Sequence, residues 1–393
     1  KDWTDSVFYI ALIVTKETKD HPHLVLLKNG NDLETNHYHH YKKYLTEKYH
    51  DARDWESYKH FWSAIDSVIK EKKVVYVSPD GIYNKINLNT LTTPDGKYLG
   101  DTKDIRIVSS TRDLIKNDEI WQPPKIKNAL LVGAPQYDLD QKKQKLLASN
   151  INNINTTDAY KFTQRSFDNT TIADLTATKK EVENIAQILK NNNYQTTTLT
   201  GELAIEEAVK SVSNPTILHI ATHGYFAEDI KYESNKGQRF MGIETQKAIE
   251  NPLLRSGLLL AGAERTTKGN YPEYSGEGID NGILTAYEVQ NMNLDSTELV
   301  VLSACETGLG EIKNGEGVYG LQRAFKVAGA RCIIMSLWKV DDRATQLLMT
   351  SFYESWLSGK TKRQAFTEAQ KKLKKSPLYS HPYYWGAFVL IGE

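Results

Sequence analysis

The chain has 393 residues, 40% of them hydrophobic and 25% charged, and its 49 basic side chains balance its 49 acidic ones. A chain of this length can bury a large core and favours two domains or lobes. The zero formal net charge gives no reason to expect an obligatory nucleic-acid or anionic-membrane partner. No apolar run approaches the roughly 18 residues of a membrane-spanning helix. Neither direct nucleic-acid binding nor membrane insertion is therefore expected.

The N-terminal segment and the cysteine content bear on where the protein works. The first ten residues, KDWTDSVFYI, lack the basic and apolar regions of a signal peptide. They also lack a methionine, so we expect a fragment or a processed form. Cys305 and Cys332 are the only two cysteines, too few for a disulfide framework. A reducing cytoplasmic location is the resulting prediction.

The first third of the chain alternates strand and helix patterns. Residues 8–15, 23–28 and 105–109 are rich in Val, Ile and Leu and predict strands. The spacing of apolar residues over 52–72 predicts a helix. The stretch VVYVSPDGIYNKINL predicts two further strands around an Asp-Gly turn at 80–81.

A Pro-Pro pair at residues 123–124 ends this segment. It predicts a boundary between a first domain, residues 1–124, and a second, residues 125–393. The second domain opens with a strand, ALLVGAP, and continues into a polar stretch rich in Asn and Thr. We expect that stretch, residues 137–171, to be a surface loop or linker.

Beyond the polar stretch the alternation of strands and helices becomes regular. Thr178 and Glu181 form one capping-box pattern, and Thr285 and Glu288 form another, each predicting the start of a helix. The strands ILHIAT, ELVVLS, CIIMSLW and GAFVLI are almost continuously apolar. Such strands, separated by helices, predict an α/β fold with a mostly parallel sheet covered by helices on both faces.

Two of these apolar strands end in reactive side chains. ILHIAT runs into His223, and LVVLS is followed one residue later by Cys305. Ligands of open parallel sheets bind beyond the carboxyl ends of the strands, so neighbouring strands would bring both side chains to one cleft. An imidazole can take the proton of a thiol, and the Gly224 and Cys305 amides could then face a developing oxyanion.

His223 and Cys305 each also have an interpretation without a catalytic role. A single cysteine after a strand is more often a packed small hydrophobe, and a single histidine there is more often a satisfied polar group. The small and glycine-containing loops that follow His223 and Cys305 favour the cleft. His219 lies inside its strand and is expected in the core. Cys332 opens a strand, at the wrong end for the cleft, and is expected to be structural.

At these positions the sequence resembles a known family. HIATHGYF and VVLSACETGLG are similar to the two signatures of the CHAT domain, and NPLLRSGLLLAGA, NGILTAYEV, GEGVYGLQRAF, MSLWKVDD and HPYYWGAFVLIG follow in order. The resemblance covers most of residues 129–393. CHAT domains are caspase- and separase-like cysteine peptidases, commonly attached to TPR repeats in prokaryotes. The resemblance implies a caspase-like sheet, His223 as general base, Cys305 as nucleophile and the Gly224 amide in the oxyanion hole.

The first 120 residues resemble, more weakly, the degenerate lobe that precedes the active lobe of separases. No cysteine precedes Cys305, so this N-terminal pseudo-protease lobe cannot hold a second Cys–His pair. A scaffold role is the expectation for it.

The segment MSLWKVDD is the expected substrate site. The resemblance to CHAT domains and separases places a strand that pairs with an extended protein substrate along residues 335–338, which include Ser336, Leu337 and Trp338. Trp338 is either a pocket wall or a core tryptophan. The adjacent carboxylates of Asp341 and Asp342 would select arginine, with lysine second, before the scissile bond. Alignment with separases favours Asp342, but either residue could instead cap the following helix.

Three other features are expected to be structural. GEGVYG matches a dinucleotide fingerprint, but eleven residues separate it from Ser303, whereas the first glycine should follow the strand directly. His37, His39 and His40 could bind a metal, although a solvated surface is favoured. Asp280 could shape the substrate site, although a turn residue before a glycine is favoured.

The combined prediction is a cytoplasmic cysteine endopeptidase that acts on a protein substrate without metal or organic cofactor. A regulatory partner or a TPR region is expected to control it. The alternative is a catalytically silent scaffold that binds a peptide or a partner protein in the cleft.

Overall fold

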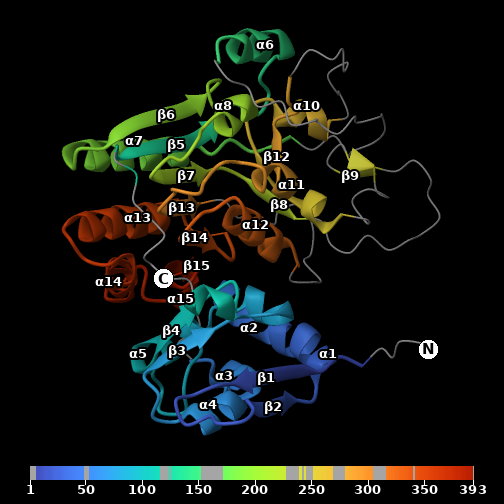
Figure 1. Ribbon diagram of the computed structural model, residues 1–393, viewed down its shortest axis with the longest axis vertical. Helices are drawn as coiled ribbons and strands as arrows, with labels where there is room; N and C mark the ends of the chain where they lie inside the picture. Colours follow the sequence, from blue (N-terminus) through green and yellow to red (C-terminus); the bar gives the residue numbers. More distant parts are fainter. Residues whose placement is uncertain are drawn as a thin grey trace.

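An eight-stranded sheet runs along the long axis of the molecule (Figure 1). The computed structural model describes residues 6–47, 53–115, 124, 126–151, 171–226, 239–240, 243–244, 251–268, 279–303, 316–339 and 341–392. The strands, in spatial order, are β3 (Val74–Val77), β4 (Asp104–Ile107), β15 (Phe388–Ile391), β14 (Ile333–Ser336), β13 (Leu299–Leu302), β7 (Ile217–Ala221), β5 (Asn128–Pro135) and β6 (Gln195–Gly201). Neighbours are parallel except for the β14–β15 pair. The predicted α/β class with a mostly parallel sheet is confirmed.

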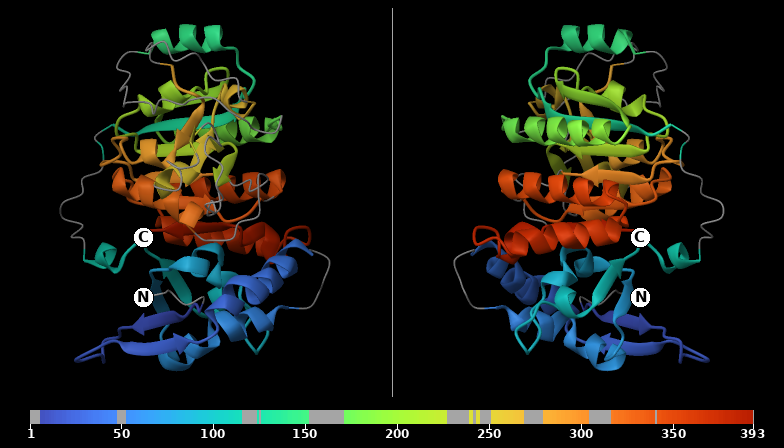
Figure 2. Two further views of the ribbon diagram at one scale, coloured as in Figure 1. Left: turned by 90° about the vertical axis from the view of Figure 1, so that its right-hand side faces the viewer. Right: turned by 90° about the vertical axis from the view of Figure 1, so that its left-hand side faces the viewer.

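Helices cover both faces of this sheet. One face carries α7 (Thr176–Asn191), α13 (Asp342–Leu357) and α14 (Lys362–Lys374), which are stacked in the right-hand view of Figure 2. The other face carries α8 (Glu206–Lys210), α11 (Ala286–Val289) and α12 (Glu316–Val327). Alternate residues of each strand point to opposite faces. Because both faces are covered, both sets of strand side chains are apolar, which explains the near-continuous hydrophobic runs.

A smaller antiparallel sheet flanks the carboxyl end of β7. It contains β12 (Ile283–Thr285), β11 (Ser256–Leu259) and β8 (Gly224–Phe226), in that spatial order. The neighbouring short elements are α6 (Gln141–Ser149), β9 (Arg239–Phe240), β10 (Ile243–Glu244), η5 (Pro252–Arg255) and α10 (Ala263–Thr267). The chain passes from β7 into β8 within three residues, so His223 stands between the two sheets.

The N-terminal segment has its own hydrophobic core but shares the central sheet. Its elements are β1 (Tyr9–Ile13), β2 (His23–Leu27), α1 (Gly30–Asp32), η1 (Leu33–His37), α2 (Tyr38–Thr46), α3 (Trp55–Phe61), α4 (Ser63–Ile69), η2 (Gly81–Lys85), η3 (Leu88–Thr90), α5 (Leu99–Thr102) and η4 (Thr111–Leu114). Their buried side chains form one cluster, while β3 and β4 join the larger sheet through the pairing of Ile107 with Ile391. The division at residue 124 into a pseudo-protease lobe and an active lobe therefore stays a prediction.

Two predicted elements differ from those in the structure, and at each of them an aspartate side chain accepts backbone N–H groups. A 3₁₀-helix, η2, replaces the strand predicted after residue 81, because the Asp80 carboxylate accepts the N–H of Gly81, whose φ is +52°. The helix α6 replaces part of the loop predicted over 137–171. Its N-cap, Asp140, accepts two backbone N–H groups of the first turn. Residues 152–170 of that predicted loop lie outside the described part of the chain.

The two predicted capping boxes have different outcomes. Thr285 and Glu288 form a complete one at the start of α11. The box predicted at Thr178 and Glu181 is wrong, because α7 begins earlier, after Leu175. The Thr178 hydroxyl instead donates to the Leu175 carbonyl and accepts the N–H of Ala134, and the Glu181 carboxylate turns inward.

The hairpin of β1 and β2 lies at the end of the molecule opposite to β6 (Figure 1). Six apolar side chains on its outer face are between 42% and 70% exposed: Phe8, Ile10, Leu12, Val14, Leu24 and Leu26. No helix in the described ranges is long and apolar enough to cross a membrane.

Candidate functional site

A small pocket of about 60 Å³ lies at the carboxyl ends of β7, β13 and β14. It is lined by Leu175, Ala177, Thr178, Glu181, Thr222, His223, Ser303, Ser336, Trp338, Lys339, Asp342, Thr345 and Phe388. The strands β7 and β13 are neighbours, which is the condition that the predicted cleft requires: Leu302 is paired with Ile220, and the Ser303 N–H donates to the Ile220 carbonyl at 2.9 Å. Cys305, two residues beyond Ser303, lies outside the described residues.

His223 is held at the pocket by its ring and by its backbone. Its side-chain Nε2 lies 2.8 Å from the carbonyl oxygen of Ala173. A carbonyl only accepts hydrogen bonds, so Nε2 carries the hydrogen and Nδ1 is the unprotonated nitrogen of the neutral ring. The Tyr137 ring lies beside the imidazole, and its hydroxyl accepts the His223 N–H at 3.4 Å. The basic nitrogen of this tautomer is therefore Nδ1.

Neither Ala173 nor Tyr137 was expected at this site. Both lie far from His223 in sequence, separated from it by 50 and 86 residues. An alanine that contributes only its carbonyl carries no side-chain signal. Sequence patterns therefore could not have identified it.

The backbone after His223 has a defined orientation. The His223 carbonyl accepts the N–H of Leu259 at 2.8 Å, and Gly224 is paired opposite Leu258. Backbone groups of successive strand residues point to opposite sides. The His223 carbonyl points toward β11. The Gly224 N–H belongs to the same peptide group and therefore points away from β11, at the outer edge of the smaller sheet.

The two adjacent carboxylates of the LWKVDD segment occupy different environments. Asp341 is the N-cap of α13, where Oδ1 accepts the N–H groups of Arg343 and Ala344 at 3.0 and 3.1 Å. Asp342, the first residue of the helix, lines the pocket together with His223. The helix-cap interpretation thus applies to Asp341, and Asp342 is the carboxylate beside the pocket.

The strand expected to pair with a substrate is only partly accessible. Met335 is paired with Leu302 on one side and Val389 on the other. Ser336 lines the pocket, and the Leu337 N–H donates to a neighbouring carbonyl at 2.8 Å. Met335 is therefore paired on both sides, whereas β13 reaches no further than Leu302 within the described residues.

Trp338 is both a pocket residue and a packing residue. It lines the pocket, and it packs against the core of the central sheet as well as the N-terminal core. Its Nε1–H donates to the Tyr383 carbonyl at 3.0 Å, and its ring and that of Tyr41 form a T-shaped pair. Trp338 therefore combines the two alternatives that the sequence left open, a pocket wall and a core tryptophan.

Glu181 is a pocket residue that sequence patterns assigned to a helix start. Its Oε1 lies 3.1 Å from Nε2 of His219, and its Oε2 lies 3.4 Å from the hydroxyl of Ser303. On the far side of the imidazole, Nδ1 of His219 lies 3.2 Å from the Tyr353 hydroxyl. His219 is fully buried, as expected for a core histidine.

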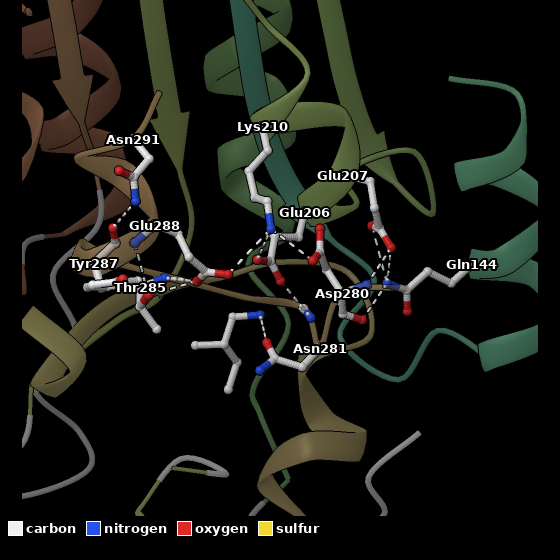
Figure 3. Close-up of polar contacts among 12 residues, drawn as sticks. Gln144, Glu206, Glu207, Lys210, Asp280, Asn281, Thr285, Tyr287, Glu288 and Asn291 are labelled. Atoms are coloured by element: carbon white, nitrogen blue, oxygen red, sulfur yellow. Dashed lines mark hydrogen bonds and ion pairs between the residues drawn. The ribbon is translucent and has the colours of Figure 1, made fainter. Parts of the chain in front are cut away.

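A second polar cluster lies on the opposite face of the sheet, around Lys210 (Figure 3). The carboxylates of Glu206, Asp280 and Glu288 offer oxygen atoms within 4.8 Å of one another, a spacing that could hold a metal ion. The Lys210 ammonium already lies among them, 2.8 Å from Asp280 and 3.3 Å from each of the other two. The cluster is therefore a buried ion-pair network, and Asp280 is one of its members, not a simple turn residue.

The surroundings of these groups shift their pKa values. Burial, with repulsion between the carboxylates, raises the pKa of Asp280 to about 6 and raises the pKa of Glu206 well above its usual range. Burial alone would lower the pKa of Lys210, but the three carboxylates outweigh it and raise that pKa above its usual value.

Two of the three histidines that the sequence offered as possible metal ligands, His37 and His40, contact neighbouring side chains. His40 Nε2 lies 3.0 Å from the Asp54 carboxylate, and the His37 ring stacks on His60 with 3.5 Å between centroids. Within the ranges that the structure describes, the Lys210 cluster is the only group of three or more potential metal ligands at such short spacing.

Comparison with known proteins identifies similar sequences and structures. A family model described as the CHAT domain matches residues 58–393. Tetratricopeptide repeat protein 28 of Mus musculus is 37% identical over 111 residues, and that of Homo sapiens is 38% identical over the same length. The matched region is 28% of this chain and only 4% of each of these relatives.

Two solved structures align with this chain. Gingipain R, titled an Arg-specific cysteine proteinase, aligns with a TM-score of 0.43 and 10% identity, over 85% of this chain and 68% of gingipain. A protein from Geobacter sulfurreducens aligns with a TM-score of 0.31 and 13% identity, over 64% of this chain and 90% of that protein.

Proposed function

The chain belongs to the CHAT domain family, and we propose that it is a cysteine endopeptidase in which Cys305 is the nucleophile and His223 the general base. The observation that carries this proposal is the pocket at the carboxyl ends of β7 and β13, which His223 and Ser303 both line. Cys305 follows Ser303 by two residues. The hydrogen bond from Nε2 to Ala173 supports the assignment, because it places the hydrogen of the neutral ring on Nε2 and so makes Nδ1 the basic nitrogen.

The reaction proceeds in two halves. The thiol proton passes to His223, and the thiolate attacks the scissile carbonyl carbon to form a tetrahedral intermediate. The N–H groups of Gly224 and Cys305 hydrogen-bond the oxyanion. The imidazolium gives its proton to the leaving amine as the C–N bond breaks, and a thioester remains. Water, deprotonated by His223, then attacks the thioester and releases the acid product and the thiol.

The pocket supports selection of a basic residue before the scissile bond. Asp342 and Glu181 place two carboxylates among the residues that line it, against one ammonium group, that of Lys339. A carboxylate in a partly desolvated pocket pairs best with a bidentate guanidinium. We propose Asp342 as the residue that receives the substrate arginine.

The Asp342→Asn variant is expected to lose this preference. Its kcat/KM for peptides with Arg before the scissile bond should fall by about 30-fold or more, equivalent to ~2 kcal/mol of lost charge pairing. The measurement compares matched peptides with Arg, Lys, Met or Asp at that position. The control is Asp341→Asn, because asparagine is as good an N-cap as aspartate and Asp341 does not line the pocket.

Efficient cleavage after Met would refute the basic pocket. Efficient cleavage after Asp would assign the recognition to Lys339 instead. An equal loss of Arg cleavage in both aspartate variants would also count against Asp342, since it would indicate a general effect on the start of α13.

We propose that the protein substrate binds as an extended strand beside residues 336–338. The antiparallel and parallel partners of Met335 leave no room for another strand there. Within the described residues β13 ends at Leu302, and the substrate strand would bond to main-chain groups of the 336–338 segment past that point.

A partner or an attached TPR region is the proposed regulator. The tetratricopeptide repeat named in both mammalian relatives supports this association. The degenerate N-terminal lobe would then act as a scaffold, without a catalytic pair of its own.

A covalent probe tests the proposed activity directly. A peptidyl chloromethyl ketone ending in arginine should alkylate Cys305 and leave the buried Cys332 unmodified, as read by peptide mass spectrometry. Absence of Cys305 alkylation, with and without partners, would favour the alternative of a silent scaffold that binds a peptide in the same pocket.

A further inference from the structure

The hairpin of β1 and β2 is apolar on both of its faces. The inner face, which includes Tyr9, Ile13 and Leu27, packs in the N-terminal core. The outer face consists of six apolar side chains that are 42–70% exposed: Phe8, Ile10, Leu12, Val14, Leu24 and Leu26. An antiparallel sheet with one solvated face normally alternates apolar and polar residues. Apolar residues on both faces are typical of a sheet that is covered on both sides, as the central sheet of this protein is.

The outer face of the hairpin is one contiguous patch. Ile10 is paired with Leu26 and Leu12 with Leu24, and side chains two positions apart on one strand share a face. The exposed fractions of the six side chains correspond to roughly 600 Å² of apolar surface, given ~150–200 Å² for a free side chain of this size. A contiguous apolar patch of this size marks an interaction surface.

The charges at the rim of the patch favour a second copy of this chain as the partner. The turn between the two strands carries two exposed basic and two exposed acidic residues: Lys16, Glu17, Lys19 and Asp20. An anionic membrane attracts clusters of basic residues, whereas this rim carries both signs. A patch without charge is complementary to itself, while a patch of one sign would repel its own copy.

The area of the patch is sufficient for a dimer. Two such patches packed face to face would bury roughly 1,200 Å², which is the lower end of the range for stable, specific interfaces. Two sheets pack about 10 Å apart with interdigitating side chains, so the twelve apolar side chains of two copies would form a small shared core. The hairpin extends to one side of the N-terminal segment (Figure 2), which leaves room for a second copy.

We propose that this chain forms a two-fold symmetric dimer in which the outer faces of the two β1–β2 hairpins pack against each other. The contact lies at the end of the molecule opposite to β6 (Figure 1). Each copy therefore keeps its own pocket, and the dimer is independent of the proposed peptidase function.

Analytical ultracentrifugation of the wild-type chain and of Leu12→Glu tests the dimer. At tens of micromolar the wild-type chain is expected to sediment as a dimer. Leu12→Glu should raise the dissociation constant of the dimer by roughly 100-fold or more, because the two-fold axis places one unpaired carboxylate from each copy in the apolar contact. Leu12 is 65% exposed, so the variant should keep the wild-type melting temperature.

The matched control is Leu146→Glu. Leu146 lies on α6 at the far end of the molecule (Figure 1) and is 64% exposed, so the same substitution there should leave the dissociation constant unchanged. A wild-type chain that stays monomeric would overturn the proposal, and so would a Leu12→Glu dimer as tight as the wild-type dimer. If Leu12→Glu does not fold, Leu24→Gln replaces it, because Leu24 lies opposite Leu12 in the same patch, and the same loss is expected.

Flotation with phosphatidylcholine vesicles distinguishes a second copy from a lipid surface. The dimer is expected to remain in the soluble fraction, because its apolar faces cover each other. A monomer that floats with the vesicles, and that no longer floats as Leu12→Glu, would overturn the dimer and assign the outer face to a lipid surface. None of these measurements uses peptide hydrolysis, so a failure of the peptidase proposal would leave their outcome unchanged.

Discussion

Replacing Cys305 or His223 with alanine is expected to lower kcat/KM for a peptide substrate by about 10⁴-fold or more. In the proposed mechanism the Cys305 thiol is the nucleophile and the His223 imidazole takes its proton, so neither variant could form the acyl-enzyme. Because the two residues act as a unit, the double variant should be little worse than either single one. Peptide hydrolysis and thermal unfolding, measured on the same preparations, separate loss of chemistry from loss of structure.

Cys332→Ala is the matched control for this experiment. Cys332 is 1% exposed and packs in the core between the sheet and α13. Its replacement should cost some stability through lost packing while leaving kcat near the wild-type value. Wild-type turnover in Cys305→Ala would eliminate the assigned pair.

Replacing Lys210 with methionine is expected to destabilise the protein by about 3–5 kcal/mol at pH 8. The substitution keeps most of the buried side-chain volume but leaves Glu206, Asp280 and Glu288 facing one another with no ammonium among them. Urea unfolding, followed by circular dichroism, measures the change in free energy. Removal of one partner from a buried network costs more than the pair itself contributes, because the remaining charges stay desolvated.

The size of this effect should depend on pH in a defined direction. The folded-state pKa of Asp280, about 6, lies above its usual value of 3.8, so between these values the folded protein binds more protons than the unfolded chain. The contribution of this group to stability therefore falls as pH rises through that window. Loss of Lys210 raises the folded-state pKa values of the carboxylates further. The destabilisation should consequently be larger at pH 8 than at pH 5.

An exposed ion pair provides the comparison. Lys43 on α2 lies 3.6 Å from Glu47 and is largely solvated, so Lys43→Met should change stability by less than about 0.5 kcal/mol at either pH. A pH-independent loss in Lys210→Met would show that its packing, and not its charge, stabilises this part of the fold.

Local sequence patterns predicted the structure correctly wherever the stabilising contacts join residues that are close in sequence. Alternation of apolar strands with helices predicted the α/β class, because a strand buried on both faces must be apolar along its whole length. The capping box of Thr285 and Glu288 was predictable for the same kind of reason, since its bonds join residues three positions apart. The carboxyl-end location of His223 followed from the course of a parallel strand.

The same local pattern failed at Glu181, because distant groups compete for its carboxylate. His219 is 38 residues away in sequence and Ser303 is 122 residues away, yet both bond to it. A two-residue signature does not contain those partners. The sequence could also not separate Asp341 from Asp342, since that depends on which one the first turn of α13 directs toward the pocket.

By itself, then, the sequence determined the family, the class of sheet and the strand end that carries His223, because these follow from periodicity and short motifs. Only the tertiary structure decided that Ala173 orients the imidazole, that Asp342 and not Asp341 lines the pocket, and that Lys210 gathers three carboxylates. The physical reason is that each of these depends on the burial and pairing of groups from different elements. The packing of the elements determines which groups are paired, and a short sequence motif does not contain that information.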